Sequence, residues 1–397
     1  MRPVIRTAAR RSRAARRAAP ALLAALLGLQ PALPLFAGPN EQAVRMHNRL
    51  AGVPPSDAVL TQMATLISNG NPQAAAQLAM DNSGFYNVTL RNFIAPATNR
   101  AQSAFVPLND YIATVIGMIR DNVPFNTVLS GDILYVGNTS GAPPYSPSNN
   151  NHYQYLDTNG VDLKSALVAT TQSANTGIPS AATAGVITTE AAAQAFFIAG
   201  TNRAMFRFTM INYLCNDLPQ VMDITRPPDR IRQDVSRSPG GDSRVFLNNC
   251  IGCHAAMDPM VQAFSYYNYD PVALELVYTP GQTQAKYHIN TGNFPAGFVT
   301  NDDSWDNRWR SGPNSLMGWS AALTGSGQGA KSLGQELASS QAFAACQVQK
   351  VFQAICLRPP GNAADQAAAA QITSDFQSSG YNMKQVFAET AVYCMGT

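Results

Sequence analysis

Hydrophobic residues recur at helical spacing over the first part of the chain. In the segment DAVLTQMATLI, Val59, Met63 and Leu66 fall three or four residues apart and so form one face of a helix. Asp57 begins that segment, and aspartate is a residue type that caps helix N-termini. The segment PLNDYIATVIGMIRDN repeats the pattern with isoleucine. We therefore predict an N-terminal helical domain over residues 38–130.

The pattern changes in residues 131–187. The segment GNTSGAPPYSPSNNNHYQY is rich in glycine, proline, asparagine and serine, which are the residues that form turns. We predict a loop-rich connection here, with His152 as a surface histidine in a polar loop.

Helical spacing returns in residues 188–397. It is clear in TTEAAAQAFFIAGTNRAMFRFTMINYLC and again in the C-terminal segments LGQELASSQAFAACQVQKVFQAIC and YNMKQVFAETAVYC. Between these segments the chain is irregular, and short strands are predicted in ALELVYT and QAKYHIN. The whole pattern predicts a mostly α-helical protein.

The first 37 residues have the composition of a secretory signal peptide. Seven arginines without an acidic residue precede an apolar run. Leu35 and Ala37 suit positions −3 and −1 of a cleavage before Gly38. An uncleaved membrane anchor is the alternative, but three prolines in the run make it a poor spanning helix. We expect a periplasmic or secreted bacterial protein with no membrane span in the mature chain.

Cleavage at this position changes the expected charge of the protein. The full chain has a formal net charge of +3, and loss of the seven arginines makes it −4. A nucleic-acid-binding protein needs a basic face, so this class is excluded.

The six cysteines fall into two groups. Cys250 and Cys253 belong to one short motif, and four cysteines remain. An exported protein meets an oxidising compartment, where four cysteines can form two disulfides in three possible pairings. We expect the pairs Cys356–Cys394 and Cys215–Cys346, and the alternative is buried free thiols.

The motif itself is CIGCH, in which His254 directly follows Cys253. Two thiols at this spacing can add to the two vinyl groups of one haem, and the next imidazole can bind the iron. We therefore predict one covalent haem c per chain, with Cys250 and Cys253 as thioethers and His254 as the proximal ligand. Zinc is one alternative, although the other histidines are isolated and form no second ligand pair. A disulfide between Cys250 and Cys253 is the other.

The second axial ligand decides between an electron carrier and a catalyst. A thioether ligand raises the reduction potential. Met317, in the glycine-bounded segment NSLMGWS, is the preferred candidate. His288 follows, then Met260 and Met257, and an open or water-bound iron is the remaining possibility.

The segment after the motif carries a predicted bend. Proline breaks a helix interior but is accepted at the first helical position. We therefore expect Asp258 to cap a new helix that begins at Pro259.

The segment CIGCHAAMDPMVQAFSYYNYD resembles the cytochrome segment of the large planctomycete-type c-type cytochromes. In that family CxxCH is followed by Met-Asp-Pro or Ile-Asp-Pro and by an aromatic-rich stretch that ends near an aspartate. The C-terminal segment, from SLGQELASS to AVYC, resembles the short helical domain that follows in the family. The family's glycine-bearing GFALE is missing here. The residues that match are Cys250, Cys253, His254, Asp258, Pro259, Phe264 and Asp270.

The resemblance implies an exported haem protein, with a monohaem cytochrome c-like region and a C-terminal helical segment within residues 188–397. We expect one-electron transfer with a redox partner protein or a respiratory complex. One alternative is a peroxidase- or oxygenase-like haem enzyme with an open iron, in which His288 or Arg308 is the polar distal residue. Another is a structural or docking subunit of a respiratory complex.

Overall fold

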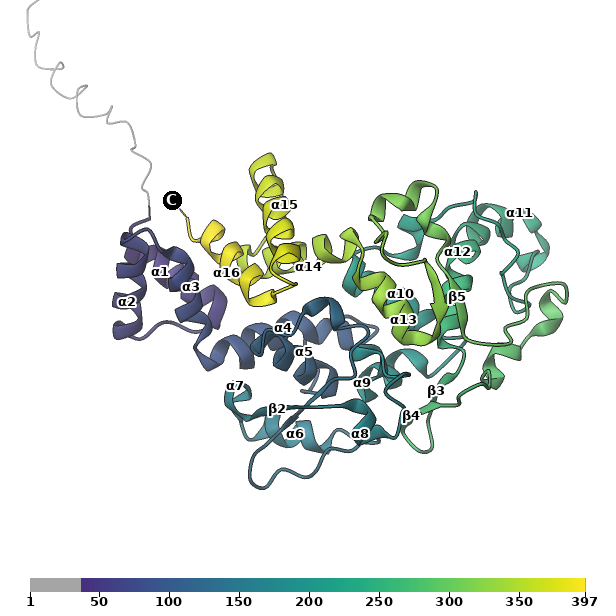
Figure 1. The fold of residues 1–397 in the computed structure, drawn as a ribbon, viewed down its shortest axis with the longest axis horizontal. Coiled ribbons are helices and arrows are strands. Elements are labelled where there is room, and N and C mark those ends of the chain that lie inside the picture. Colours follow the sequence, from purple (N-terminus) through teal and green to yellow (C-terminus); the bar gives the residue numbers. More distant parts are fainter. Residues whose placement is uncertain (1–36, 397) are drawn as a thin grey trace, which may run out of the picture.

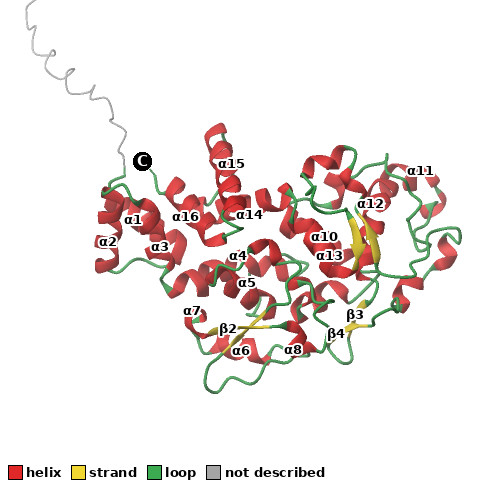
Figure 2. Cartoon of the chain, in the orientation of Figure 1, coloured by secondary structure: helices red, strands yellow, loops and turns green. Residues whose placement is uncertain are grey.

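The computed structural model describes residues 37–396, which form a mostly helical protein with three two-stranded sheets (Figures 1 and 2). The mostly α prediction is therefore confirmed. The predicted signal peptide lies outside the described residues except for Ala37. Within residues 37–396 the structure contains no helix that is both long and apolar enough to cross a membrane.

The two ends of the chain pack together. Figure 1 shows the N-terminal helices beside the C-terminal ones, and α1 and α3 both contact α16. Arg45 and Arg49 donate hydrogen bonds to the carbonyls of Met395 and Cys394, at 2.8 and 3.0 Å. These helices are α1 (Pro39–Ala51), α2 (Asp57–Ser68), α3 (Pro72–Met80), α14 (Gln341–Cys356), α15 (Ala363–Ser378) and α16 (Met383–Cys394). We call these six helices, with α4, α5 and α10, the helical body.

The N-terminus of α2 differs from the prediction by one residue. Ser56 is the N-cap, and its hydroxyl accepts a hydrogen bond from the Val59 amide. Asp57 is the first helical residue instead. A carboxylate in the first turn is still favourable because it faces the positive end of the helix dipole.

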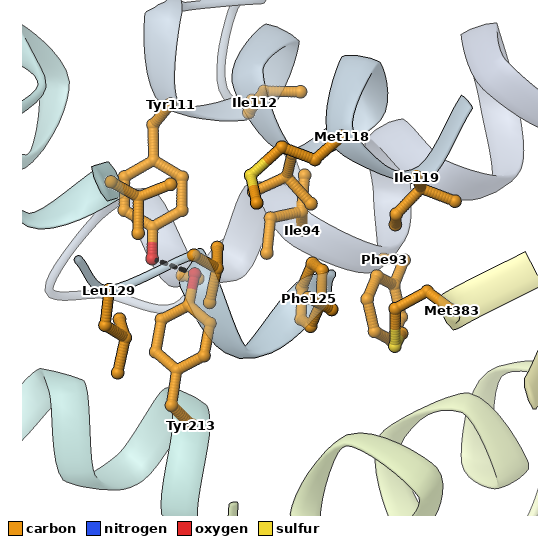
Figure 3. Packing of buried hydrophobic residues seen from close by; sticks show 14 of the residues in the cluster. Phe93, Ile94, Tyr111, Ile112, Met118, Ile119, Phe125, Leu129, Tyr213 and Met383 are labelled. Carbon is orange, nitrogen blue, oxygen red and sulfur yellow. Dashed lines mark hydrogen bonds between the residues drawn. The ribbon is translucent and has the colours of Figure 1, made fainter. Parts of the chain in front are cut away.

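Helix α5 (Asp110–Arg120) lies at the centre of the body, and every residue from Asp110 to Ile119 is buried. It packs with α4 (Arg91–Ile94), and Figure 3 shows its apolar side chains among those of neighbouring helices. The hydroxyls of Tyr111 and Tyr213 lie 2.7 Å apart, which joins α5 to α10 (Arg203–Leu214) through a buried hydrogen bond. Pairing removes the cost of burying two hydroxyl groups.

Both predicted disulfides are present. Cys215–Cys346 joins the end of α10 to α14, and Cys356–Cys394 joins α14 to α16. The helical body is therefore closed by two covalent links as well as by packing.

Residues 131–187 contain more regular structure than their composition predicts. Strand β1 (Leu134–Gly137) pairs with β2 (Leu167–Thr170) in antiparallel register, and three short helices surround the pair. The prediction for His152 was wrong, because the residue is only 3 % exposed and its Nε2 accepts a hydrogen bond from the Gly137 amide at 2.8 Å. The helices are α6 (Asn151–Thr158), α7 (Leu163–Ala166) and α8 (Gln172–Thr176).

The rest of the chain carries the CxxCH motif. Its helices are α9 (Glu190–Ala192), α11 (Ser243–Val245), α12 (Ile251–Val261) and α13 (Gly329–Ala338). Its hairpins are β3 (Tyr267–Asp270) with β4 (Glu275–Tyr278) and β5 (Ser304–Asp306) with β6 (Ser326–Gln328). The strand predicted in ALELVYT is confirmed as β4. The one predicted in QAKYHIN was wrong, because a 3₁₀ turn, Ala285–His288, stands there.

Candidate functional site

The CxxCH motif begins at the last residue of a π-helical turn, Phe246–Cys250, and continues into the first turn of α12. Such wide turns occur often at functional sites because they redirect the side chains that follow. The predicted helix break was wrong, because α12 continues through Pro259 to Val261. Asp258 caps no helix, since its carboxylate is bound by Arg203 inside the protein instead.

The two motif thiols are the free cysteines of the chain, and both are partly exposed. Cys253 Sγ lies 3.6 Å from the carbonyl oxygen of Leu218, as a weak hydrogen-bond donor. Burial, with the neighbouring Cys250, raises the pKa of the Cys253 thiol. The two cysteines are therefore unpaired, partly exposed and on one turn of chain, as attachment to a single ligand requires.

The imidazole of His254 has one nitrogen bound and one available. Its Nδ1 lies 3.1 Å from Oδ1 of Asp258, four residues later on the same helix. The side chain of His254 is 20 % exposed and that of Asp258 is fully buried. The hydrogen bond holds the ring through Nδ1 and leaves Nε2 available.

Asp258 belongs to a buried group of charges. Arg203 donates from Nε and Nη2 to its two oxygens at 2.8 and 3.0 Å, and a second pair of bonds joins Arg203 to Asp234 at 2.7 and 3.1 Å. The Arg232 side chain, only 1 % exposed, lies over the Tyr287 ring at 4.8 Å. Burial favours a neutral Asp258, but the charge of Arg203, the interaction with His254 and the charge of Arg232 outweigh it and hold its pKa well below the usual value. Asp258 is therefore a carboxylate.

Apolar side chains are exposed beside the motif. Met222 and Ile224 lie against Gly252, where an added Cβ would stand 2.2 Å from Met222 Cγ. Leu316 lies on a turn that is held to the same segment, because Asn314 donates to the Val221 carbonyl at 2.8 Å. We call five residues the apolar rim, with their exposed fractions: Met222 45 %, Ile224 63 %, Val245 37 %, Leu247 54 % and Leu316 90 %.

The hydrophobic cluster beneath the start of the motif is small. A separate cluster of four buried residues supports it, with Cys250 and Ile251 packed against the edge. Its members are Ile231, Val235, Phe246 and Ala255.

The structure places the candidates for the second axial position in different surroundings. Met317 ends a 3₁₀ turn, Pro313–Met317, and its side chain, 8 % exposed, packs in the main core. His288 is exposed at the end of its turn, next to Tyr287, whose hydroxyl donates to the Val261 carbonyl at 3.2 Å. Met257 and Met260 are buried on α12 itself.

Arg308, considered as a polar distal residue, is already bound. Its guanidinium forms ion pairs with Asp229 and Asp306, and it donates to the Pro227 carbonyl at 2.5 Å. These bonds hold the side chain on the loop that precedes α11.

The structure gives no support to the two alternatives to haem. Cys250 and Cys253 are not joined in a disulfide. Over residues 37–396, no three His, Cys, Asp or Glu side chains come close enough together to hold a metal ion, whereas structural zinc has four ligands.

Sequence reasoning missed the partners of His254. The spacing of four residues between His254 and Asp258 could have indicated their contact, because such residues share a helix face. Arg203 and Asp234 lie 55 and 24 residues before Asp258 and carry no signal of spacing. The apolar rim was missed because its residues lie on separate short turns and loops, where single hydrophobic residues give no periodic pattern.

A pocket of about 640 Å³ lies in another part of the chain and is lined in part by Glu190 and Tyr269. Burial first, and then the charge of Asp110, raise the pKa of Glu190 to about 8. Asp110 itself is buried and accepts hydrogen bonds from the amides of Glu190 and Ala191 at 2.6 and 3.1 Å. Asp110 thus binds the first two amides of α9, whose N-cap residue is Thr189.

Comparison with protein-family models, with curated proteins and with solved structures gave no match for this chain. The resemblance to planctomycete-type cytochromes therefore rests only on the motif segment and the C-terminal segment of the sequence.

Proposed function

We propose that the protein is an exported monohaem c-type cytochrome that performs one-electron transfer. Cys250 and Cys253 would hold the haem by thioether bonds, and His254 would bind the iron. The observation that carries the proposal is the combination, on one turn of chain, of two free thiols and an imidazole whose inner nitrogen is already bound.

The surroundings of the motif fit a haem. A porphyrin is a large apolar plate, and the apolar rim offers side chains that would otherwise remain in contact with water. Burial of apolar surface contributes about 25 cal/mol per Å², so covering these side chains would favour the loaded protein. When bound, the haem iron supplies the one-electron chemistry, while the chain sets the potential and the access of partners.

The other cysteines support an oxidising compartment. Both disulfides join helices of the body, and such bonds persist mainly in exported proteins. This agrees with export to the periplasm or the cell exterior after removal of residues 1–37. Partners would be a redox protein or a respiratory complex.

The second axial ligand remains Met317 in this proposal, with His288 as the alternative. Met317 is buried in the main core, whereas His288 is exposed. An open iron, in a haem enzyme, is the second candidate function.

Absorption spectra separate these functions. The protein is produced with a haem-attachment system, and spectra are recorded oxidised, reduced, and reduced with carbon monoxide. An electron carrier gives a low-spin spectrum that carbon monoxide leaves unchanged, and a weak far-red sulfur-to-iron band that Met317→Ala removes would identify Met317 as the ligand. A low-spin spectrum without that band assigns His288, and His288→Ala is the matching variant. A high-spin spectrum with ready carbon monoxide binding would contradict electron transfer as the function and indicate an enzyme.

A further inference from the structure

We propose that Asp258 is a positioning residue for the haem iron. Its carboxylate binds the Nδ1–H group of His254, so that Nε2 is presented to the iron and the imidazole becomes a stronger electron donor. This inference rests on the proposed function, and it adds how the potential of the same site is set.

The geometry determines the direction of the hydrogen bond. An ionised carboxylate only accepts, so the nitrogen of His254 that lies 3.1 Å from Asp258 Oδ1 must be the donor. Neutral histidine carries a single ring proton. A proton on Nδ1 leaves the lone pair of Nε2 free for a metal.

The carboxylate is held firmly in place. Two hydrogen bonds from Arg203 fix both of its oxygens, and the Arg232 amide lies 3.4 Å from Oδ2. Arg203 begins α10 and Asp258 lies in α12, so the position of the imidazole is tied to a neighbouring helix. Arg203 is always charged and donates to both oxygens at once, which is the arrangement that an ionised carboxylate accepts.

The chemical consequence follows from the charge. Histidines that bind metals usually donate their other N–H group to an oxygen, and a carboxylate partner raises the basicity of the ligand. A more basic imidazole stabilises oxidised iron over reduced iron, so it lowers the reduction potential. Hydrogen bonding around the ligand is one of the means by which a protein tunes haem.

A purely structural role is the competing explanation, because Asp258 also joins α12 to α10. Asp234 provides the matched control. Its carboxylate forms two hydrogen bonds with the same Arg203, and it is also mostly buried, yet it forms no hydrogen bond with His254. A structural effect would be shared by both aspartates, whereas an effect through the imidazole belongs to Asp258 alone.

The first experiment measures the midpoint potential of the haem-loaded full-length protein as wild type, Asp258→Asn and Asp234→Asn. Asparagine keeps the shape and can accept the same hydrogen bond, but it lacks the charge. We expect a higher potential in Asp258→Asn and a clearly smaller shift in Asp234→Asn. An unchanged potential in Asp258→Asn, or equal shifts in the two variants, would overturn the proposal.

The second experiment needs no variant that could fail to fold. Nitrogen-15 chemical shifts of the His254 ring, measured at pH 8 in the full-length wild type without haem, report which nitrogen carries the proton. The proposal expects the Nδ1–H tautomer, and the Nε2–H tautomer would refute it. Failure of the wild type to take up covalent haem would instead contradict the proposed function, so the two failures are distinguishable.

Discussion

The helical body and the region around the CxxCH motif differ in how many of their reactive and apolar groups find partners within the chain. Around α5 the apolar side chains are buried, a pair of tyrosine hydroxyls bind each other, and two disulfides close the structure. Around the start of α12, two thiols are free, one imidazole nitrogen is unused and the apolar rim faces water. The body is thus closed by its own contacts, whereas the motif region leaves two thiols, one ring nitrogen and several apolar side chains free, as the proposed haem would require.

The largest difference between the regions is expected from core truncation. Ile116 in α5 is fully buried, so Ile116→Ala should lower the free energy of unfolding by about 2–5 kcal/mol. Leu247→Ala, in the apolar rim, should change it by less than about 0.5 kcal/mol in the protein without haem. Chemical denaturation measures both values. A comparable loss in the two variants would mean that the rim already belongs to a packed core.

Removal of the disulfide Cys215–Cys346 tests whether the helical body can be weakened without affecting the motif. It closes a sequence separation of 131 residues, and the double variant Cys215→Ala/Cys346→Ala should lose about 2–4 kcal/mol of stability. Haem attachment should remain, because neither sulfur belongs to the motif. Denaturation and a peroxidase-activity gel stain for covalent haem measure the two effects. Loss of the stain in this variant would show that the regions are not separable.

The smallest effect is expected at Glu190, a carboxyl group whose burial costs the folded protein stability. The pKa of Glu190 is about 8 in the folded protein, above the value of an unfolded chain. The unfolded state therefore releases the proton first, and stability falls as the pH rises from about 4.5 to about 8.

Glu190→Gln should remove this fall and raise the free energy of unfolding at pH 8 by about 1–2 kcal/mol, after allowance for solvent screening. At pH 4 the variant and the wild type should be equal. Chemical denaturation at pH 4 and pH 8 measures these differences, and Glu41→Gln, at an exposed position, is the control. A Glu190→Gln variant that is no more stable at pH 8 would show that the carboxyl group is well solvated.

Sequence patterns predicted the parts of the fold that depend on local order. The helices around Met63 and Ile116 follow from apolar spacing, and two disulfides follow from the number of cysteines and the compartment. Neither signal indicates which cysteines pair, because four cysteines allow three pairings. Tertiary contacts overrode local signals elsewhere. His152 is buried although its segment is polar, because Gly137 provides a partner for its ring.

The sequence predicted only those site residues that lie close to one another along the chain. CxxCH identified Cys250, Cys253 and His254, and spacing on one helix could have added Asp258. The contacts of Arg203 and Asp234 required the packing of α10 against α12, which no periodicity encodes. Pro259 misled because a helix interior tolerates proline when other contacts hold the turn, as those of Asp258 do here.

Covalent haem is the central claim, and the mass of the intact, denatured protein tests it most directly. The wild type and the variant Cys250→Ser/Cys253→Ser are produced in the same cells with a haem-attachment system. The account predicts that the wild type exceeds the mass of its polypeptide by one haem and that the variant does not. A wild type with the mass of its polypeptide alone would contradict the account.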